Sequence, residues 1–316
     1  AARLPRYGVT AFCPTSVACA PAVLDTFLDA VGRARASDTR GSARVLRAHL
    51  ESNFLNPAWS GAQPVHCLRH FHGATEPDEG TFTGDDILRI MQARAEAVGI
   101  VTLAPEQPGG LDLVRLLRDR GHIVSLGHSG ATYDQARESV RAGVTHATHL
   151  FNRMTPITHR EPGCVGAMLE AAEVAAEIIC DGYHVHPRVV SLTIGLKGAG
   201  RVMAITDGTA ASGLPAGSRA TLGGRPIVVT SRSATLEDGT LAGSTTTMDR
   251  VFRLLVREVG APLEVAARLC ATTPADRLGL PHLGRIGPGA SADLVVMNSA
   301  LDVVQTWIAG VPAAEH

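Results

Sequence analysis

Four residues that could carry out hydrolytic chemistry each follow or end a short apolar stretch. Glu51 ends ARVLRAHLE, His128 and His149 follow IVSL and VTHAT, and Asp207 follows RVMAIT. One glutamate and two histidines form a known catalytic zinc set that leaves a coordination position for water. Zinc lowers the pKa of that water towards about 7. A neighbouring carboxylate such as Asp207 can accept the proton and pass it to a leaving group.

Each of these residues also has a structural explanation. A histidine at a strand end more often makes a structural hydrogen bond than binds a metal, although imidazole is the commonest metal ligand. Asp207 precedes Gly208, and Asp-Gly is a common turn pair. We favour the chemical interpretation because the set combines metal ligands with a proton acceptor.

Polar residues after His149 indicate an anionic substrate. Asn152, Arg153 and Arg160 follow it closely, and an arginine here could bind a phosphate or carboxylate through two hydrogen bonds. His184, in DGYHVHP, ends another apolar stretch and could contact the same substrate.

Helical patterns separate the candidate residues, which favours an α/β fold. Residues 133–142, for example, have a helical pattern between the stretches that precede His128 and His149. Alternating strands and helices are typical of a (β/α)8 barrel, whose chemistry lies at the C-terminal ends of the strands. The seven candidate strands end near Thr15, Glu51, Glu106, His128, His149, Asp181 and Asp207.

The fold class predicted is therefore a TIM-type (β/α)8 metal-dependent hydrolase barrel with one strand too few. We expect the first strand, and half of a small β-sandwich domain, to precede Ala1, because the chain opens without Met and within a helical pattern. Residues 1–284 are predicted to form the barrel, with a β-hairpin insertion near 218–240, and residues 285–316 the remaining strands of the small domain. Two helices are predicted over 262–270 and 275–279.

Composition limits the possible partners. The 316 residues include 29 basic and 30 acidic ones, for a formal net charge of −1, which gives no electrostatic case for nucleic acid or a membrane surface. No apolar run approaches the roughly 18 residues of a membrane span. Six scattered cysteines without a CxxC pair indicate reduced thiols and a cytoplasmic protein.

The chain resembles the N-acetylglucosamine-6-phosphate deacetylases of the amidohydrolase superfamily. The resemblance lies in motifs that occur in the family's order over nearly the whole chain: HLESNFLNP, VTLAPE, GHSGATYDQA, THLFNRM, REPG, DGYHVHP, ITDG, DGTLAGSTTTMD and GPGASADLVV. It implies a (β/α)8 barrel with a small β-sandwich. It also implies hydrolysis of N-acetylglucosamine 6-phosphate to glucosamine 6-phosphate and acetate in amino sugar catabolism.

The resemblance also assigns roles to residues. It implies that Glu51, His128 and His149 bind one or two divalent metal ions, most simply Zn²⁺, and that Asp207 is the catalytic acid and base. The positions that match substrate-contacting residues are Asn152, Arg160, His184, Leu241, Ala242 and Gly243. In the family, the arginine that matches Arg160 reaches the neighbouring subunit's site, which implies a homodimer.

The sequence departs from the family pattern in the substrate region. Gln63 stands where the family has a phosphate-side histidine, and Arg153 where it has alanine. The usual Glu-Gly-Pro is Glu51-Ser52-Asn53 here, and the first-strand HxH motif is absent. Gln63 and Arg153 could form a rearranged phosphate site or recognise another substrate.

Two alternatives stay open. One is an amidohydrolase that acts on a different acidic N-acyl or cyclic amide substrate. The other is an inactive truncated fragment that keeps the barrel.

Overall fold

The fold is built around a curled parallel sheet that carries the candidate residues at one end. The computed structural model describes residues 1–37, 40–71, 81–230 and 232–313. Over these residues the sheet has seven parallel strands, with β2 and β9 at its edges. In sheet order they are β2 (Thr15–Ser16), β4 (Ala48–Glu51), β5 (Val98–Leu103), β6 (Ile123–Leu126), β7 (Val144–Ala147), β8 (Ala175–Ile179) and β9 (Val202–Ile205).

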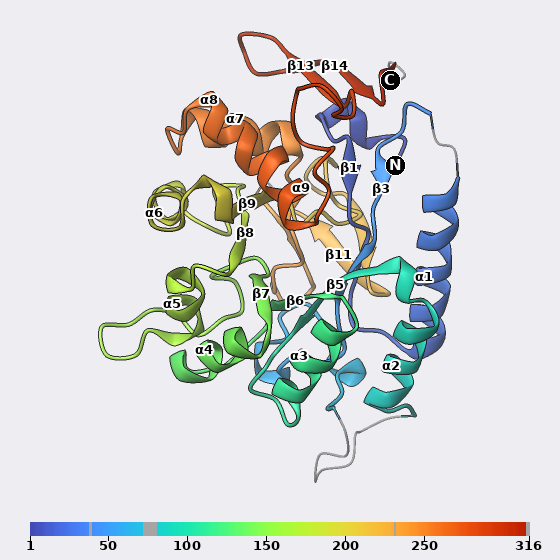
Figure 1. Ribbon diagram of the computed structural model, residues 1–316, viewed down its shortest axis with the longest axis vertical. Helices are drawn as coiled ribbons and strands as arrows, with labels where there is room; N and C mark the ends of the chain where they lie inside the picture. Colours follow the sequence, from blue (N-terminus) through green and yellow to red (C-terminus); the bar gives the residue numbers. More distant parts are fainter. Residues whose placement is uncertain (38–39, 72–80, 231, 314–316) are drawn as a thin grey trace.

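Helices cover the outside of this sheet and follow one another around it in chain order (Figure 1). This arrangement confirms the predicted barrel architecture. None of the described helices is long and apolar enough to span a bilayer. The α-helices are α1 (Pro21–Ala36), α2 (Gly84–Ala93), α3 (Gly110–Asp119), α4 (Tyr133–Ala142), α5 (Gly163–Glu170), α6 (Pro187–Lys197), α7 (Met248–Arg257), α8 (Leu263–Ala267) and α9 (Thr273–Arg277). The 3₁₀ turns are η1 (Leu4–Tyr7), η2 (Pro57–Trp59), η3 (Val65–Cys67), η4 (Ala95–Ala97) and η5 (Ala199–Arg201).

Local sequence accounts for these elements. The run VGIVTL forms β5 and is almost wholly buried, as expected of a parallel strand covered on both faces. Helices α2 and α4 begin with capping boxes at Thr83 and Thr132, whose side chains accept hydrogen bonds from the backbone of the first turn. These signals place the starts of the two helices.

Short strands lie outside the main sheet. β1 (Ala11–Phe12) pairs with β3 (Arg44–Val45). Where a β-hairpin insertion is predicted, β10 (Arg219–Leu222), β11 (Arg225–Val229) and β12 (Ala234–Thr235) form a three-stranded antiparallel sheet. The C-terminal tail forms β13 (Leu294–Met297), β14 (Val303–Ile308) and β15 (Val311–Pro312). This small sheet is attached near the start of the chain, because Thr306 donates a hydrogen bond of 2.6 Å to the Pro5 carbonyl. The boundary between the two predicted domains stays a prediction.

The C-terminal helices differ from the sequence prediction of two separate helices. α8 and α9 are continuous, joined by the π-helical turn η6 (Arg268–Thr272). Pro274 lies in the first turn of α9 and has no backbone N–H to donate. The wider turn carries the chain past this missing donor without ending the helix.

The inner face of the sheet below the candidate residues is polar. His49 points to this face, two residues before Glu51 on β4. Its Nε2 lies 2.6 Å from Thr102 Oγ1, which lies 2.7 Å from Thr148 Oγ1. Ser125 Oγ lies 2.6 Å from the same Thr148 oxygen. These buried side chains, which we call the inner polar chain, link four neighbouring strand segments by hydrogen bonds.

Candidate active site

Glu51, His128 and His149 meet at the C-terminal edge of the sheet. His149 Nε2 lies 2.9 Å from Glu51 Oε1 and 3.0 Å from His128 Nε2. His128 Nε2 lies 3.5 Å from the same Glu51 oxygen. All three residues are buried, and one ligand atom from each lies within 4.8 Å of the others. The three side chains can therefore bind one metal ion.

The charges at this cluster favour a cation. Burial alone would raise the pKa of Glu51, but hydrogen bonds and charge from His128 and His149 hold it well below 4.5. Burial alone would lower the pKa of His149, but Glu51 raises it to about 9, with help from Asp207 and Glu177. A site that stabilises an imidazolium in this way also suits a divalent cation, because both place positive charge beside the same carboxylate.

The loop after β4 holds His128 in place. Its Nδ1 lies 2.9 Å from the Trp59 carbonyl oxygen, so Nδ1–H can donate there and leave Nε2 as the ligand atom. A Cβ at Gly130 would lie 2.5 Å from Trp59 Nε1, so the second glycine of GHSG lets Trp59 approach. Glu106 accepts hydrogen bonds from Ser129 Oγ at 2.7 Å and Gly130 N at 2.6 Å. Sequence reasoning missed Trp59, because a backbone carbonyl carries no signal in residue type.

Three of the four candidate metal-binding and catalytic residues share an unusual backbone conformation, as does Arg153. φ is +49° at His128, +33° at His149 and +48° at Asp207. Such values are uncommon outside glycine and occur preferentially at functional sites. The shared conformation supports a functional assignment for all three.

Asp207 is half-buried beside this cluster. Burial and the charge of Glu51 raise its pKa above the ordinary 3.8. Its carbonyl accepts a hydrogen bond of 2.9 Å from Ser244 N, which brings the predicted turn 241–243 next to it. A Cβ at Gly243 would lie 2.7 Å from that carbonyl oxygen, so this approach requires glycine. A carboxyl group with a raised pKa suits proton transfer near neutral pH.

Asp181 orients the predicted substrate residue His184. His184 Nδ1 lies 2.7 Å from Asp181 Oδ2, and Ser244 Oγ donates to the same oxygen at 2.8 Å. Burial opposes ionisation of Asp181, but His184 lowers its pKa to about 2. The ionised Asp181 therefore fixes the imidazole and leaves Nε2 available to a substrate. The i,i+3 spacing in DGYH is the sequence signal that could have identified Asp181.

Of the other predicted substrate residues, two lie near the candidate metal ligands and one lies apart from them. Asn152 Nδ2 donates to the His149 carbonyl at 3.1 Å. Arg153 packs on Gly61, where an added Cβ would lie 3.0 Å from Arg153 Nε. Arg160 is exposed and forms no hydrogen bond or ion pair with the described part of the chain. The structure thus brings Asn152 and Arg153 to the site region and leaves Arg160 apart.

Gln63 contacts a candidate metal ligand. Its side-chain NH2 donates to Glu51 Oε2, and its Oε1 accepts a hydrogen bond of 2.9 Å from Ala18 N. The residue is buried, and both ends of its amide are used within the protein. In this geometry Gln63 positions Glu51.

We expect Gln63→Ala to weaken metal binding by about 10- to 100-fold, the usual effect of removing an outer hydrogen-bond partner of a ligand. Competition with a chromophoric chelator measures this affinity. Gln92→Ala, on the exposed face of α2, is the matched control. Wild-type affinity in Gln63→Ala would contradict a positioning role.

Glu177, on β8, is a buried carboxyl group that sequence reasoning missed. Burial raises its pKa to about 8, and the charges of Glu51 and Asp207 add to this effect. Because the folded protein holds this proton more tightly than the unfolded chain, its contribution to stability falls as pH rises from about 4.5 to about 8. The loss reaches about 1.4 kcal/mol per pH unit.

We therefore expect Glu177→Gln to make unfolding less sensitive to pH. In chelator-treated protein, the variant should match wild type near pH 5 and melt at a higher temperature at pH 8. Thermal unfolding followed by circular dichroism tests this, with the exposed Glu138→Gln as control. Parallel pH profiles for wild type and Glu177→Gln would show that Glu177 does not titrate in this range.

Known proteins resemble this chain over most of its length. The N-acetylglucosamine-6-phosphate deacetylase of Lysinibacillus sphaericus is 36% identical over 85% of this chain and 66% of its own length. The enzyme of the same name from Danio rerio is 36% identical over 98% of this chain and 75% of its own. The N-acetylgalactosamine-6-phosphate deacetylase of Escherichia coli is 35% identical over 96% and 78%. The chain thus spans 66% to 78% of the length of these relatives.

A solved structure is also similar to this chain. An N-acetyl-D-glucosamine-6-phosphate deacetylase from Mycobacterium smegmatis, in complex with N-acetyl-D-glucosamine-6-phosphate, has a TM-score of 0.87 at 34% identity, over 98% of this chain and 78% of that one. The sequence also matches the amidohydrolase family over residues 76–312. The chain therefore belongs to the amidohydrolase family, together with the N-acetylglucosamine-6-phosphate deacetylases.

Proposed function

We propose that this protein hydrolyses the acetamide bond of N-acetylglucosamine 6-phosphate, giving glucosamine 6-phosphate and acetate. The observation that carries the proposal is the buried convergence of Glu51, His128 and His149, with Asp207 beside them. The names of the relatives support the substrate, because several are deacetylases of this sugar phosphate.

Glu51, His128 and His149 would hold a divalent metal ion, which we propose to be Zn²⁺. When bound, such an ion lowers the pKa of a water molecule and polarises a carbonyl group. The donor set fits, because the protein directs one carboxylate oxygen and two imidazole nitrogens to one point.

The chain's own residues supply the proton transfers. Asp207 accepts a proton from the attacking water and delivers it to the amine nitrogen as the C–N bond breaks. With both ring nitrogens protonated, His184 would donate from Nδ1 to Asp181 and from Nε2 to the acetamide oxygen as negative charge develops there. Asn152, Arg153 and the turn 241–243 border the space where the sugar would lie.

Acetate release from N-acetylglucosamine 6-phosphate in the presence of zinc tests the proposal. We expect turnover that stops when a chelator is added and returns with excess zinc. N-acetylglucosamine without phosphate should react far more slowly. Stoichiometric zinc binding without acetate release would contradict the deacetylase assignment and leave the metal site standing.

A second candidate substrate is N-acetylgalactosamine 6-phosphate. The Escherichia coli relative, named for this activity, is 35% identical over 96% of the chain. The two sugars differ only at one hydroxyl group, so a direct comparison of kcat/KM identifies the preferred one.

We further propose a cytoplasmic homodimer in which Arg160 serves the neighbouring site. Arg160 is exposed and has no partner in the described part of its own chain, which leaves it available. All six cysteines are free, in keeping with a reducing compartment. Sedimentation measures the dimer, and mixing Arg160→Ala with Asp207→Asn subunits should restore partial activity if the sites are shared.

A further inference from the structure

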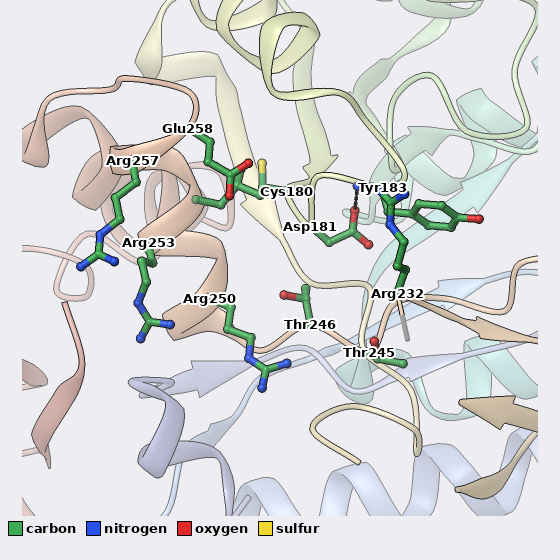
Figure 2. Close-up of a pocket in the computed structure, with 11 residues that line it drawn as sticks. Cys180, Asp181, Tyr183, Arg232, Thr245, Thr246, Arg250, Arg253, Arg257 and Glu258 are labelled. Atoms are coloured by element: carbon green, nitrogen blue, oxygen red, sulfur yellow. Dashed lines mark hydrogen bonds between the residues drawn. The ribbon is translucent and has the colours of Figure 1, made fainter. Parts of the chain in front are cut away.

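A cavity of about 430 Å³ lies between α7 and the chain that follows β8. Figure 2 shows Arg250, Arg253 and Arg257 on one side and Arg232 with Tyr183 on the other, with two threonines between. The lining does not include the candidate metal ligands, Asp207 or His184. The cavity therefore lies beside the candidate active site, with Asp181 in the wall that the two share.

Two of the four arginines already have partners. Arg253 forms a 2.8 Å ion pair with Asp302, and Arg257 donates a 2.7 Å hydrogen bond to the Ala300 carbonyl. Both contacts fasten the turn before β14 to α7. These guanidinium groups form a fixed part of the wall.

The other two are exposed and form no ion pair in the described part of the chain. The Arg250 side chain makes no hydrogen bond or ion pair with the residues that the structure describes. The Arg232 guanidinium lies 4.7 Å above the Tyr183 ring and pairs with no carboxylate in the described chain. Stacking on a ring leaves the N–H edge of a guanidinium free to donate.

Carboxylates on the wall do not neutralise this charge. Asp181 uses both oxygens within the protein: Oδ1 accepts from the backbone of Tyr183 and His184, and Oδ2 accepts from His184 and Ser244. Glu258 is exposed and forms no ion pair with a described arginine. The cavity wall thus has four guanidinium groups and two carboxylates, and one of these, Asp181, already uses both oxygens in hydrogen bonds within the protein.

We propose that this cavity is a binding site for a phosphate group, either free or as the monoester of a small metabolite. Arginine is the side chain best suited to phosphate, because its planar fork makes two parallel hydrogen bonds to adjacent oxygens. Thr245 and Thr246 place hydroxyl donors on the same wall. The volume is in the range of small-ligand sites.

Titration of the protein with inorganic phosphate and with glucose 6-phosphate, followed by calorimetry at low salt, tests the proposal. We expect saturable binding that weakens as sodium chloride is added. Arg250→Gln should weaken binding about 10- to 100-fold, since it removes a charge-assisted hydrogen bond. Tighter binding of glucose 6-phosphate than of inorganic phosphate would identify a metabolite as the ligand, and the reverse order would identify free phosphate.

Two controls separate this cavity from other sites. Arg115→Gln removes an exposed arginine on α3 and should bind phosphate as wild type does. Arg160→Gln removes the arginine predicted to serve the active site and should keep the binding that depends on Arg250. Thermal unfolding checks that Arg250→Gln is folded. The proposal is overturned if wild type fails to bind phosphate, if Arg250→Gln binds equally well, or if Arg160→Gln alone removes binding.

Discussion

Replacing Asp207 with asparagine is expected to lower kcat by about 10⁴-fold while the bound metal stays near one ion per chain. This lies at the upper end for general acid–base catalysis, because Asp207 serves in both proton transfers. Burial and the charge of Glu51 raise its pKa, which favours the protonated carboxyl group that delivers the proton to the amine. Asparagine cannot exchange a proton in this range.

Asparagine is also the replacement that preserves the backbone. Asp207 has φ of +48°, a region that asparagine enters more readily than most residues. Acetate release gives kcat, and elemental analysis of the purified variant gives the metal content. The exposed Asp112→Asn is the matched control. A parallel loss of metal would show that Asp207 is a ligand.

Glu51→Gln is expected to remove metal binding and, with it, activity. Losing one charged partner of a buried pair costs about 3–5 kcal/mol, which corresponds to an affinity loss of about 10²- to 10⁴-fold. The neutral amide also ends the interaction that raises the pKa of His149 to about 9. Burial then dominates, and the pKa of His149 should fall.

Two measurements check this variant separately. Chelator competition gives the metal affinity, and NMR titration of the His149 ring in chelator-treated protein gives its pKa. Glu138→Gln, on the exposed side of α4, should change neither quantity. If His149 kept its raised pKa in Glu51→Gln, another group would have to be responsible for the shift.

The convergence of the candidate metal ligands could be predicted because each lies at or near the C-terminal end of a strand that is recognisable in the sequence. Glu51, His128 and His149 are distant in sequence, but each follows a buried strand of one parallel sheet. Parallel strands bring their C-terminal ends to one edge. The structure places the three side chains together there, while their roles stay proposals.

Residues whose roles depend on loop paths could not be predicted in the same way. The family resemblance assigns Gln63 to a substrate position, but the loop after β4 folds back so that its amide contacts Glu51. Glu177 shows no sequence signal for its raised pKa, because the shift comes from burial and distant carboxylates. The π turn before Pro274 likewise depends on how the helix avoids one missing donor.

The inner polar chain constrains how this sequence can change over evolutionary time. Thr148 lies within 2.7 Å of hydroxyl groups on two other residues, Thr102 and Ser125. An apolar replacement at any one position leaves a buried polar partner without its hydrogen bond. Replacement of the whole set by apolar residues of similar shape leaves no buried polar group unpaired. Single apolar substitutions at these positions are therefore expected to destabilise the protein. We expect homologues to have either the whole set of polar side chains or an apolar set in its place. These positions should therefore covary among homologues.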